Sequence, residues 1–146
     1  MTRSCVFCRV AAGELPGNIV HRDERVLAFL DASPLMLGHV LVVPIAHADT
    51  LDDLAPELIG PLFAVVQRMS IAVQRAFGAG GSFVAINTRT SQSVPHVHVH
   101  VVPRNEGDGL FSPRPIWKRR TYASDGEASE YAQKLRVAYA DVAAGR

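Results

Sequence analysis

Apolar residues recur along the chain with two different periods, which separate helical from extended segments. Between Pro56 and Phe77 they recur at steps of three and four, the spacing of one helix face. Pro56 suits the first turn of such a helix, and Gly78 is a typical end. The pattern also predicts a short helix at Cys5–Ala12 and a second long helix at Ser124–Ala143, capped by Ser124 or Asp125.

Short apolar runs bounded by glycine, proline or charged residues are typical of strands. Residues 105–121, rich in Gly, Pro and Arg, are expected to be irregular. Because strands mostly follow strands and one long helix interrupts them, the order favours an α+β fold with an antiparallel sheet. The expected strands are Asn18–His21, Arg25–Asp31, His39–Pro44, Ser82–Asn87 and a run from Pro95 to Arg104.

Composition limits the class of protein. The chain has 146 residues, of which 48% are hydrophobic, so one folded domain is expected rather than a disordered segment. The net charge is +1 and the arginines are scattered, so no patch indicates a nucleic acid or an anionic membrane. No signal-peptide pattern and no apolar run of membrane-spanning length is seen, so we expect a cytoplasmic domain without a membrane partner.

The run PHVHVHVVPR alternates histidine with valine. Because side chains of a strand alternate between its faces, His96, His98 and His100 share one face, and the valines share the other, which should pack on the core helix. An open sheet face ordinarily carries Thr, Lys or Glu, so three imidazoles there indicate chemistry. Metal binding and nucleophilic attack by a neutral imidazole both remain open.

The motif CVFC places Cys5 and Cys8 at a spacing that lets two thiolates reach one ion. A redox pair would need a preceding strand, and only four residues come before it, so metal is favoured. Zinc prefers four nitrogen or sulfur ligands. His47 is a candidate third ligand, and the triple-histidine run could supply a fourth. The alternative is a pair of small buried thiols.

Taken together, these segments resemble the histidine triad (HIT) family of nucleotide hydrolases and transferases, including nucleoside phosphoramidases and dinucleoside polyphosphate hydrolases. The resemblance rests on HVHVHVV and, in the same order, on CVFCRVAAGELP, RVLAFLDASPLMLGHVLVVPIAHADTLDDL and INTRTSQSVPHVHVHVVPR. It covers residues 5–104 and leaves 105–146 as a C-terminal extension of a single domain. It implies a five-stranded antiparallel sheet flanked by a long and short helices, and a homodimer with helix 56–77 at the interface.

The resemblance also implies roles for the triad. His98 would attack the α-phosphate of a purine nucleotide and form a nucleotidyl-histidine that water hydrolyses, while its other ring nitrogen donates to a backbone carbonyl. His100 would contact the phosphate or assist the leaving group, and His96 completes the catalytic set. Residues that match nucleotide contacts are Asn87, Gln92 and Ser93 at the phosphate, Asp31 at the ribose, and Phe7, Val10, Leu15 and Phe29 around the purine. His21 and His39 match no motif role.

Zinc-binding, bacterial-type members of the family have a ligand pattern that this chain matches. The matching residues are Cys5, Cys8, His47 and His96. Such a zinc would be structural, because four protein ligands close the site. It would tether the N-terminal segment to the catalytic strand and leave His98 free to attack.

Several functions follow from these patterns. The first is hydrolysis of purine nucleotide conjugates, such as adenosine phosphoramidates or aminoacyl-adenylates, at the α-phosphate. The second is hydrolysis of diadenosine polyphosphates, for which Trp117 and the basic run Lys118–Arg120 could contact a second phosphate or nucleotide. A third is a non-catalytic, dimeric nucleotide sensor, and a fourth is a metal-handling protein that uses the three histidines as an open site.

Overall fold

The computed structural model describes residues 4–113 and 118–146, and its centre is an antiparallel sheet in the order β1-β2-β3-β5-β4. The strands are β1 Ile19–Arg22, β2 Val26–Leu30, β3 Val40–Pro44, β4 Gly81–Ile86 and β5 Val99–Arg104. The helices are α1 Val6–Ala11, the 3-10 helix η1 Leu51–Asp53, α2 Pro56–Phe77 and α3 Asp125–Ala143. The expected α+β fold with a five-stranded antiparallel sheet is confirmed.

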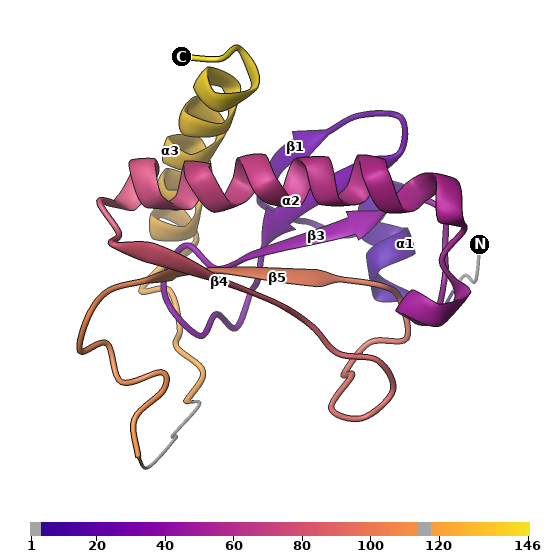
Figure 1. Ribbon diagram of the computed structural model, residues 1–146, viewed down its shortest axis with the longest axis horizontal. Coiled ribbons are helices and arrows are strands. Elements are labelled where there is room, and N and C mark those ends of the chain that lie inside the picture. Colours follow the sequence, from indigo (N-terminus) through magenta and orange to yellow (C-terminus); the bar gives the residue numbers. More distant parts are fainter. Residues whose placement is uncertain (1–3, 114–117) are drawn as a thin grey trace.

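Helix α2 covers one face of the sheet, and α3 packs against α2 and β1 and completes the main hydrophobic core there (Figure 1). Alternate side chains of the central strands point toward them, as strand geometry requires. The strand expected from Pro95 to Arg104 begins only at Val99, so His96, Val97 and His98 lie in the segment that leads into β5. The valines of the run, Val97, Val99 and Val101, are nevertheless all buried in this core. The helix residues that meet the sheet include Leu62, Val65, Met69, Val73 and Leu135.

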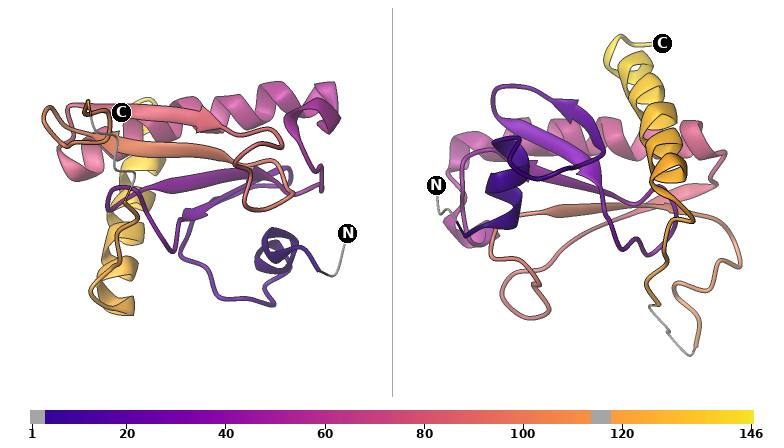
Figure 2. Two further views of the ribbon diagram at one scale, coloured as in Figure 1. Left: turned by 90° about the horizontal axis from the view of Figure 1, so that it is seen from below. Right: turned by 180° about the vertical axis from the view of Figure 1, so that it is seen from behind.

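The other face of the sheet is covered by α1, which lies opposite α2 (Figure 2). Phe7 and Val10 of α1 pack on the second set of alternating side chains from β2 and β3. The expectation that the histidines lie on an open face is therefore wrong. His96, His98 and His100 are only 0%, 3% and 9% exposed, because Phe7 of the N-terminal segment packs against the first two rings and His39 packs against the third.

The ends of the long helices follow the expected chemistry. Pro56 stands in the first turn of α2, and Gly78 ends it in the left-handed conformation at φ +60°. The hydroxyl of Ser124 accepts a hydrogen bond from the backbone N–H of Glu127 and caps α3. By length and mean hydropathy α2 could cross a membrane, but core helices of folded domains meet the same criteria, and Leu62 of α2 is fully buried against the sheet.

Gly38 brings the chain into β3 at close range to α2. Its φ of +93° lies in the region that favours glycine, and an added Cβ would stand 2.4 Å from the ring of Phe77. This close approach places His39 directly before β3, next to His100 of β5. The position of that buried histidine thus depends on the absence of a side chain at residue 38.

Candidate active site and metal centre

His98 presents one free ring nitrogen. Its Nδ1 lies 2.7 Å from the carbonyl oxygen of His96. A carbonyl can only accept, so Nδ1 carries the hydrogen and Nε2 carries the lone pair. The ring of Phe7 packs edge-on against the imidazole, with 5.3 Å between ring centroids. The hydrogen bond thus fixes the orientation of His98 and leaves Nε2 as the nitrogen available to act as a nucleophile.

His100 has the opposite arrangement because a second histidine stands behind it. The backbone N–H of Leu35 donates to Nδ1 of His39 at 3.1 Å, so the hydrogen of His39 is on Nε2. That Nε2 lies 2.9 Å from Nδ1 of His100 and donates to it. The hydrogen of His100 must then be on Nε2. Two neighbouring triad imidazoles are fixed in different tautomers, one as an acceptor and one as a donor.

Both members of the buried histidine pair are neutral near pH 7. Burial, followed by the charge of His100, lowers the pKa of His39 to about 2. Burial, followed by the neighbouring His98, lowers the pKa of His100 to about 4. The tautomer assignment therefore applies at physiological pH, where His100 offers an N–H donor without a full positive charge.

A cavity of about 970 Å³ opens beside His98 and His100. Its walls include residues of α1, the loop after β2, and the segment that leads into α3. The rings of Phe7 and Phe29 meet edge to face, with 5.4 Å between centroids, and form an apolar corner. Six of the residues expected to contact a nucleotide line this cavity: Phe7, Val10, Leu15, Phe29, Asp31 and Ser93.

Asn87 and Gln92 are not on the wall of this cavity, and their phosphate-binding roles stay predictions. Gln92 accepts from the backbone N–H of Arg89 and donates to the carbonyl of Val94, so its amide holds the loop together. Arg89 and Ser91 both have positive φ, 64° and 63°, although neither is glycine. Such conformations cost on the order of 1 kcal/mol each, which marks this loop as a strained part of the site.

Two residues of the site have no motif that predicts them. His39 follows Gly38, and only the fold brings it within hydrogen-bonding distance of His100. Arg119 belongs to the irregular segment before α3, where its basic run was the only sequence signal, and its Nη1 donates to Asp31 at 3.0 Å. Trp117, considered with that run, lies outside the described residues.

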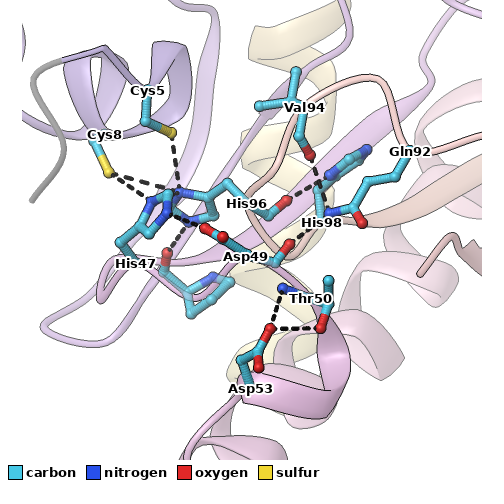
Figure 3. A network of polar contacts seen from close by, with 11 residues as sticks. Cys5, Cys8, His47, Asp49, Thr50, Asp53, Gln92, Val94, His96 and His98 are labelled. Carbon is cyan, nitrogen blue, oxygen red and sulfur yellow. Dashed lines mark hydrogen bonds and ion pairs between the residues drawn. The ribbon is translucent and has the colours of Figure 1, made fainter. Parts of the chain in front are cut away.

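A second cluster of side chains lies between α1 and the catalytic strand (Figure 3). Nδ1 of His96 lies 3.4 Å from Sγ of Cys5 and 3.6 Å from Sγ of Cys8. Nδ1 of His47 lies 3.3 Å from Sγ of Cys8 and 3.2 Å from Nδ1 of His96. Two sulfur and two nitrogen atoms thus converge on one point.

These separations fit a tetrahedral zinc ion. With Zn–S bonds of about 2.3 Å and Zn–N bonds of about 2.0 Å, a tetrahedron has edges of about 3.3 Å between nitrogens and about 3.5 Å between nitrogen and sulfur. The far nitrogens are also satisfied, since Nε2 of His96 donates to the carbonyl of Pro44 at 2.8 Å and Nε2 of His47 lies 2.7 Å from Asp49. Burial lowers the pKa of His96, which favours the neutral form that a metal ligand needs. With four protein ligands, the cluster fits a structural zinc site.

The comparisons with known proteins agree with this geometry. A sequence model described as the HIT domain matches residues 12–107. A Zn-bound histidine triad family protein from Mycobacterium smegmatis is similar in structure, with a TM-score of 0.83 and 35% identity over 98% of each chain.

Two relatives have names that describe an activity. Adenylylsulfatase HINT3 of Arabidopsis thaliana is 30% identical over 93% of this chain and 70% of its own length. Bis(5'-nucleosyl)-tetraphosphatase (asymmetrical) of Schizosaccharomyces pombe is 32% identical over 74% of this chain and 59% of its own length. The match of the domain model over residues 12–107, on a chain with this sheet and these three histidines, shows that the protein belongs to the histidine triad (HIT) family.

Proposed function

We propose that the protein hydrolyses purine nucleotide conjugates at the α-phosphate through a nucleotidyl-histidine formed on His98. The observation that carries the proposal is the free Nε2 of His98, fixed by the carbonyl of His96, at the wall of a cavity that also contains Asp31. The names of the two relatives that act on nucleotides support the same class of reaction.

The chemistry follows from the two tautomers. Nε2 of His98 attacks the α-phosphorus, a P–N bond forms, and the bond to the leaving group breaks, with the electron pair departing on that group. Nε2–H of His100 donates to a phosphate oxygen or to the leaving atom as charge develops. Water then attacks the same phosphorus, the P–N bond breaks with its electron pair returning to Nε2, and the proton lost by the water goes to the departed group or to solvent, while Nδ1–H stays hydrogen-bonded to the carbonyl of His96.

The cavity supports a purine nucleoside as the fixed half of the substrate. The carboxylate of Asp31 can accept hydrogen bonds from ribose hydroxyls, and the corner of Phe7 and Phe29 can take the flat face and edge of a purine. Adenosine phosphoramidates and aminoacyl-adenylates are the leading substrates. The name of the Arabidopsis relative adds adenylyl sulfate, and that of the S. pombe relative supports diadenosine polyphosphates as the alternative.

Replacing the nucleophile tests the proposal. We expect His98→Asn to lower kcat at least about a thousandfold for the best substrate of a panel of adenosine phosphoramidate, adenylyl sulfate and diadenosine tetraphosphate. His21→Asn is the matched control, because His21 lies on β1 beside Asp23 and away from the cavity. Circular dichroism would confirm that both variants fold.

Two outcomes would contradict the proposal. If His98→Asn kept most of the activity, the nucleophile would be wrong. If the wild-type protein bound AMP but turned over no substrate, and no nucleotide could be trapped on it after a quench without acid, the sensor alternative would be favoured. Nucleotide that is found attached to the wild-type protein and is absent from His98→Asn supports the covalent intermediate.

We also propose that the chain forms a homodimer through β4 and α2. β4 is an edge of the sheet, so its outer backbone groups can pair with a second copy. Large apolar side chains are exposed along the same side: Ile59, Phe63 and Ile71 on α2, and Val84 on β4. Phe63→Lys should shift the mass measured by light scattering from two chains to one, whereas Val137→Lys, at an exposed position on α3, should not.

A further inference from the structure

Arg119 lies beside the carboxylate to which we assign the ribose. Its Nη1 donates both to Oδ2 of Asp31 at 3.0 Å and to the carbonyl oxygen of Ser33 at 2.8 Å. The side chain comes from the segment between β5 and α3, and it lines the nucleotide cavity together with Tyr122. The extension after residue 104 therefore contributes a cation to the ribose end of the site.

Asp31 can keep this arginine and still accept a sugar hydroxyl. Its Oδ1 accepts the backbone N–H of Ser33 at 2.9 Å, and its Oδ2 accepts Arg119. A carboxylate has about four acceptor positions, so each oxygen retains one. A ribose bound there would stand next to the guanidinium without displacing it.

Arg119 also lines a second cavity. Nε and Nη2 of Arg119 have no acceptor among residues 4–113 and 118–146, although each carries N–H donors. The second cavity has a volume of about 520 Å³ and shares Arg119 and Thr121 with the nucleotide cavity. Lys118 and Arg120 also line it.

The second cavity has an excess of positive charge. Asp108 is the carboxylate on its described wall, and it is already bound by two nitrogens of Arg104, at 2.6 and 2.8 Å. The hydrogen bonds from Arg104 hold the pKa of Asp108 well below its usual range. Arg119 is paired with Asp31, but Lys118 and Arg120 have no carboxylate partner among residues 4–113 and 118–146, so this wall carries an excess of positive charge. Such a wall favours an anion, and planar guanidinium groups suit phosphate in particular.

We propose that Arg119, assisted by Lys118 and Arg120, binds a phosphate group carried on the ribose, so that the preferred substrates are nucleotides phosphorylated at the 2′ or 3′ oxygen. This inference rests on the proposed function, because it needs the ribose at Asp31. The unmodified hydroxyl donates to Asp31, and Arg119 lies between that carboxylate and the phosphate and offsets their repulsion. An arginine beside the ribose serves ribose phosphates in the same way in dinucleotide-binding folds.

Calorimetric titration of the zinc-loaded wild-type protein tests the proposal with four probes: AMP, adenosine 3′,5′-bisphosphate, adenosine 2′,5′-bisphosphate and ADP. We expect one of the two bisphosphates to bind at least about tenfold more tightly than AMP, the gain typical of a charge-assisted phosphate contact. The bisphosphate that binds more tightly than AMP shows whether the subsite takes a phosphate on the 2′ or on the 3′ oxygen.

The decisive quantity is the ratio of the two dissociation constants, AMP over bisphosphate. Arg119→Gln should bring it close to one, while any indirect effect on Asp31 acts on both ligands and cancels. Arg146→Gln, which changes an exposed arginine paired with Asp141, should leave the ratio at its wild-type value.

Each contrary outcome has a distinct meaning. If AMP binds and neither bisphosphate binds more tightly than AMP, this inference is wrong and the proposed function stands. The same holds if the tighter binding of a bisphosphate persists in Arg119→Gln. If ADP binds more tightly than AMP by as much as the bisphosphates do, and this difference disappears in Arg119→Gln, the subsite takes a phosphate of the 5′ chain. The inference is then also wrong. If neither AMP nor the bisphosphates bind, both proposals fail.

Discussion

At the scale of single residues, neighbouring imidazoles on one strand face differ because of the groups behind them. His98 is backed by a carbonyl oxygen and His100 by the N–H of another imidazole. Alternation along the strand predicts that the two rings share a face, but it does not predict their tautomers. The tautomer of His100 depends on His39, which is 61 residues away in the sequence.

This buried pair should make stability depend on pH. In the unfolded chain both histidines bind protons near their usual pKa of 6.5, whereas in the folded protein the pKa of His100 is about 4 and that of His39 about 2. Below about pH 6.5 the unfolded chain therefore binds protons that the folded protein does not, and the free energy of unfolding falls. The fall continues toward pH 4 for His100 and toward pH 2 for His39. Urea unfolding between pH 7.5 and 4.5 should show a falling free energy of unfolding.

The variant His39→Gln isolates one of these protons. Glutamine is of similar size and can still bond to both neighbours, but it does not titrate. Below about pH 6 the slope of the unfolding free energy should become shallower by about 1.4 kcal/mol per pH unit, the value for one proton. An unchanged slope would show that His39 is not held neutral in the folded protein.

Candidate site residues could be predicted only as far as a motif identified them. Asp31 and Phe29 come from an extended motif, and the fold brings them to one cavity with the triad. Asn87 and Gln92 came from the same resemblance, but the side chain of Gln92 bonds within its own loop. Arg119 could not be placed, because a basic run in an irregular segment does not show which carboxylate it will meet.

At the scale of elements, periodicity and glycine or proline ends predicted the helices and four of the strands closely, whereas β5 begins at Val99 and not at Pro95, so that of the three histidines only His100 lies within the strand. α2 has the predicted ends, Pro56 and Phe77, because both are fixed by local chemistry. The segment between β5 and α3 could only be predicted as irregular. Its path is set by single contacts between distant residues, such as the backbone hydrogen bond from Arg120 to Pro34.

The close contact between Gly38, which precedes β3, and Phe77 of α2 can be tested at this scale. Gly38→Ala should lower the free energy of unfolding by about 2–4 kcal/mol, because the new Cβ meets the ring of Phe77 and the positive φ is unfavourable. Gly78→Ala is the matched control: it has φ +60° and open space around it, so about 1 kcal/mol is expected. Chemical denaturation of both variants measures the difference, and equal losses would show that the contact with Phe77 is not limiting.

At the scale of the whole molecule, the two faces of the sheet are stabilised by different means. The α2 and α3 face has a continuous hydrophobic core, whereas the α1 face has a smaller cluster next to the four zinc ligands. Such a division could be anticipated from the paired cysteines. The ligand pattern also anticipated that the N-terminal segment reaches the histidine run, but it did not predict how completely the three imidazoles would be buried.

Removal of the metal should therefore affect stability strongly. We expect about one zinc per chain by elemental analysis and a fall in Tm of roughly 10 °C after chelation, as for loss of a ligand held far above its dissociation constant. Cys8→Ser should abolish zinc binding, while Ala12→Ser, at the exposed end of α1, should retain it. If chelation removed activity without changing Tm, the metal would belong to an open catalytic site instead.

The shortness of α1 has a consequence for ligand uptake. Six residues cannot sustain a helix by themselves, so α1 takes its shape from its anchors. It places Cys8 in the zinc-ligand cluster and Phe7 at the proposed purine corner. Zinc binding and purine binding should therefore be thermodynamically linked. The supply of zinc would then set how many copies can bind the proposed adenine base, and by reciprocity a bound base would slow the release of zinc.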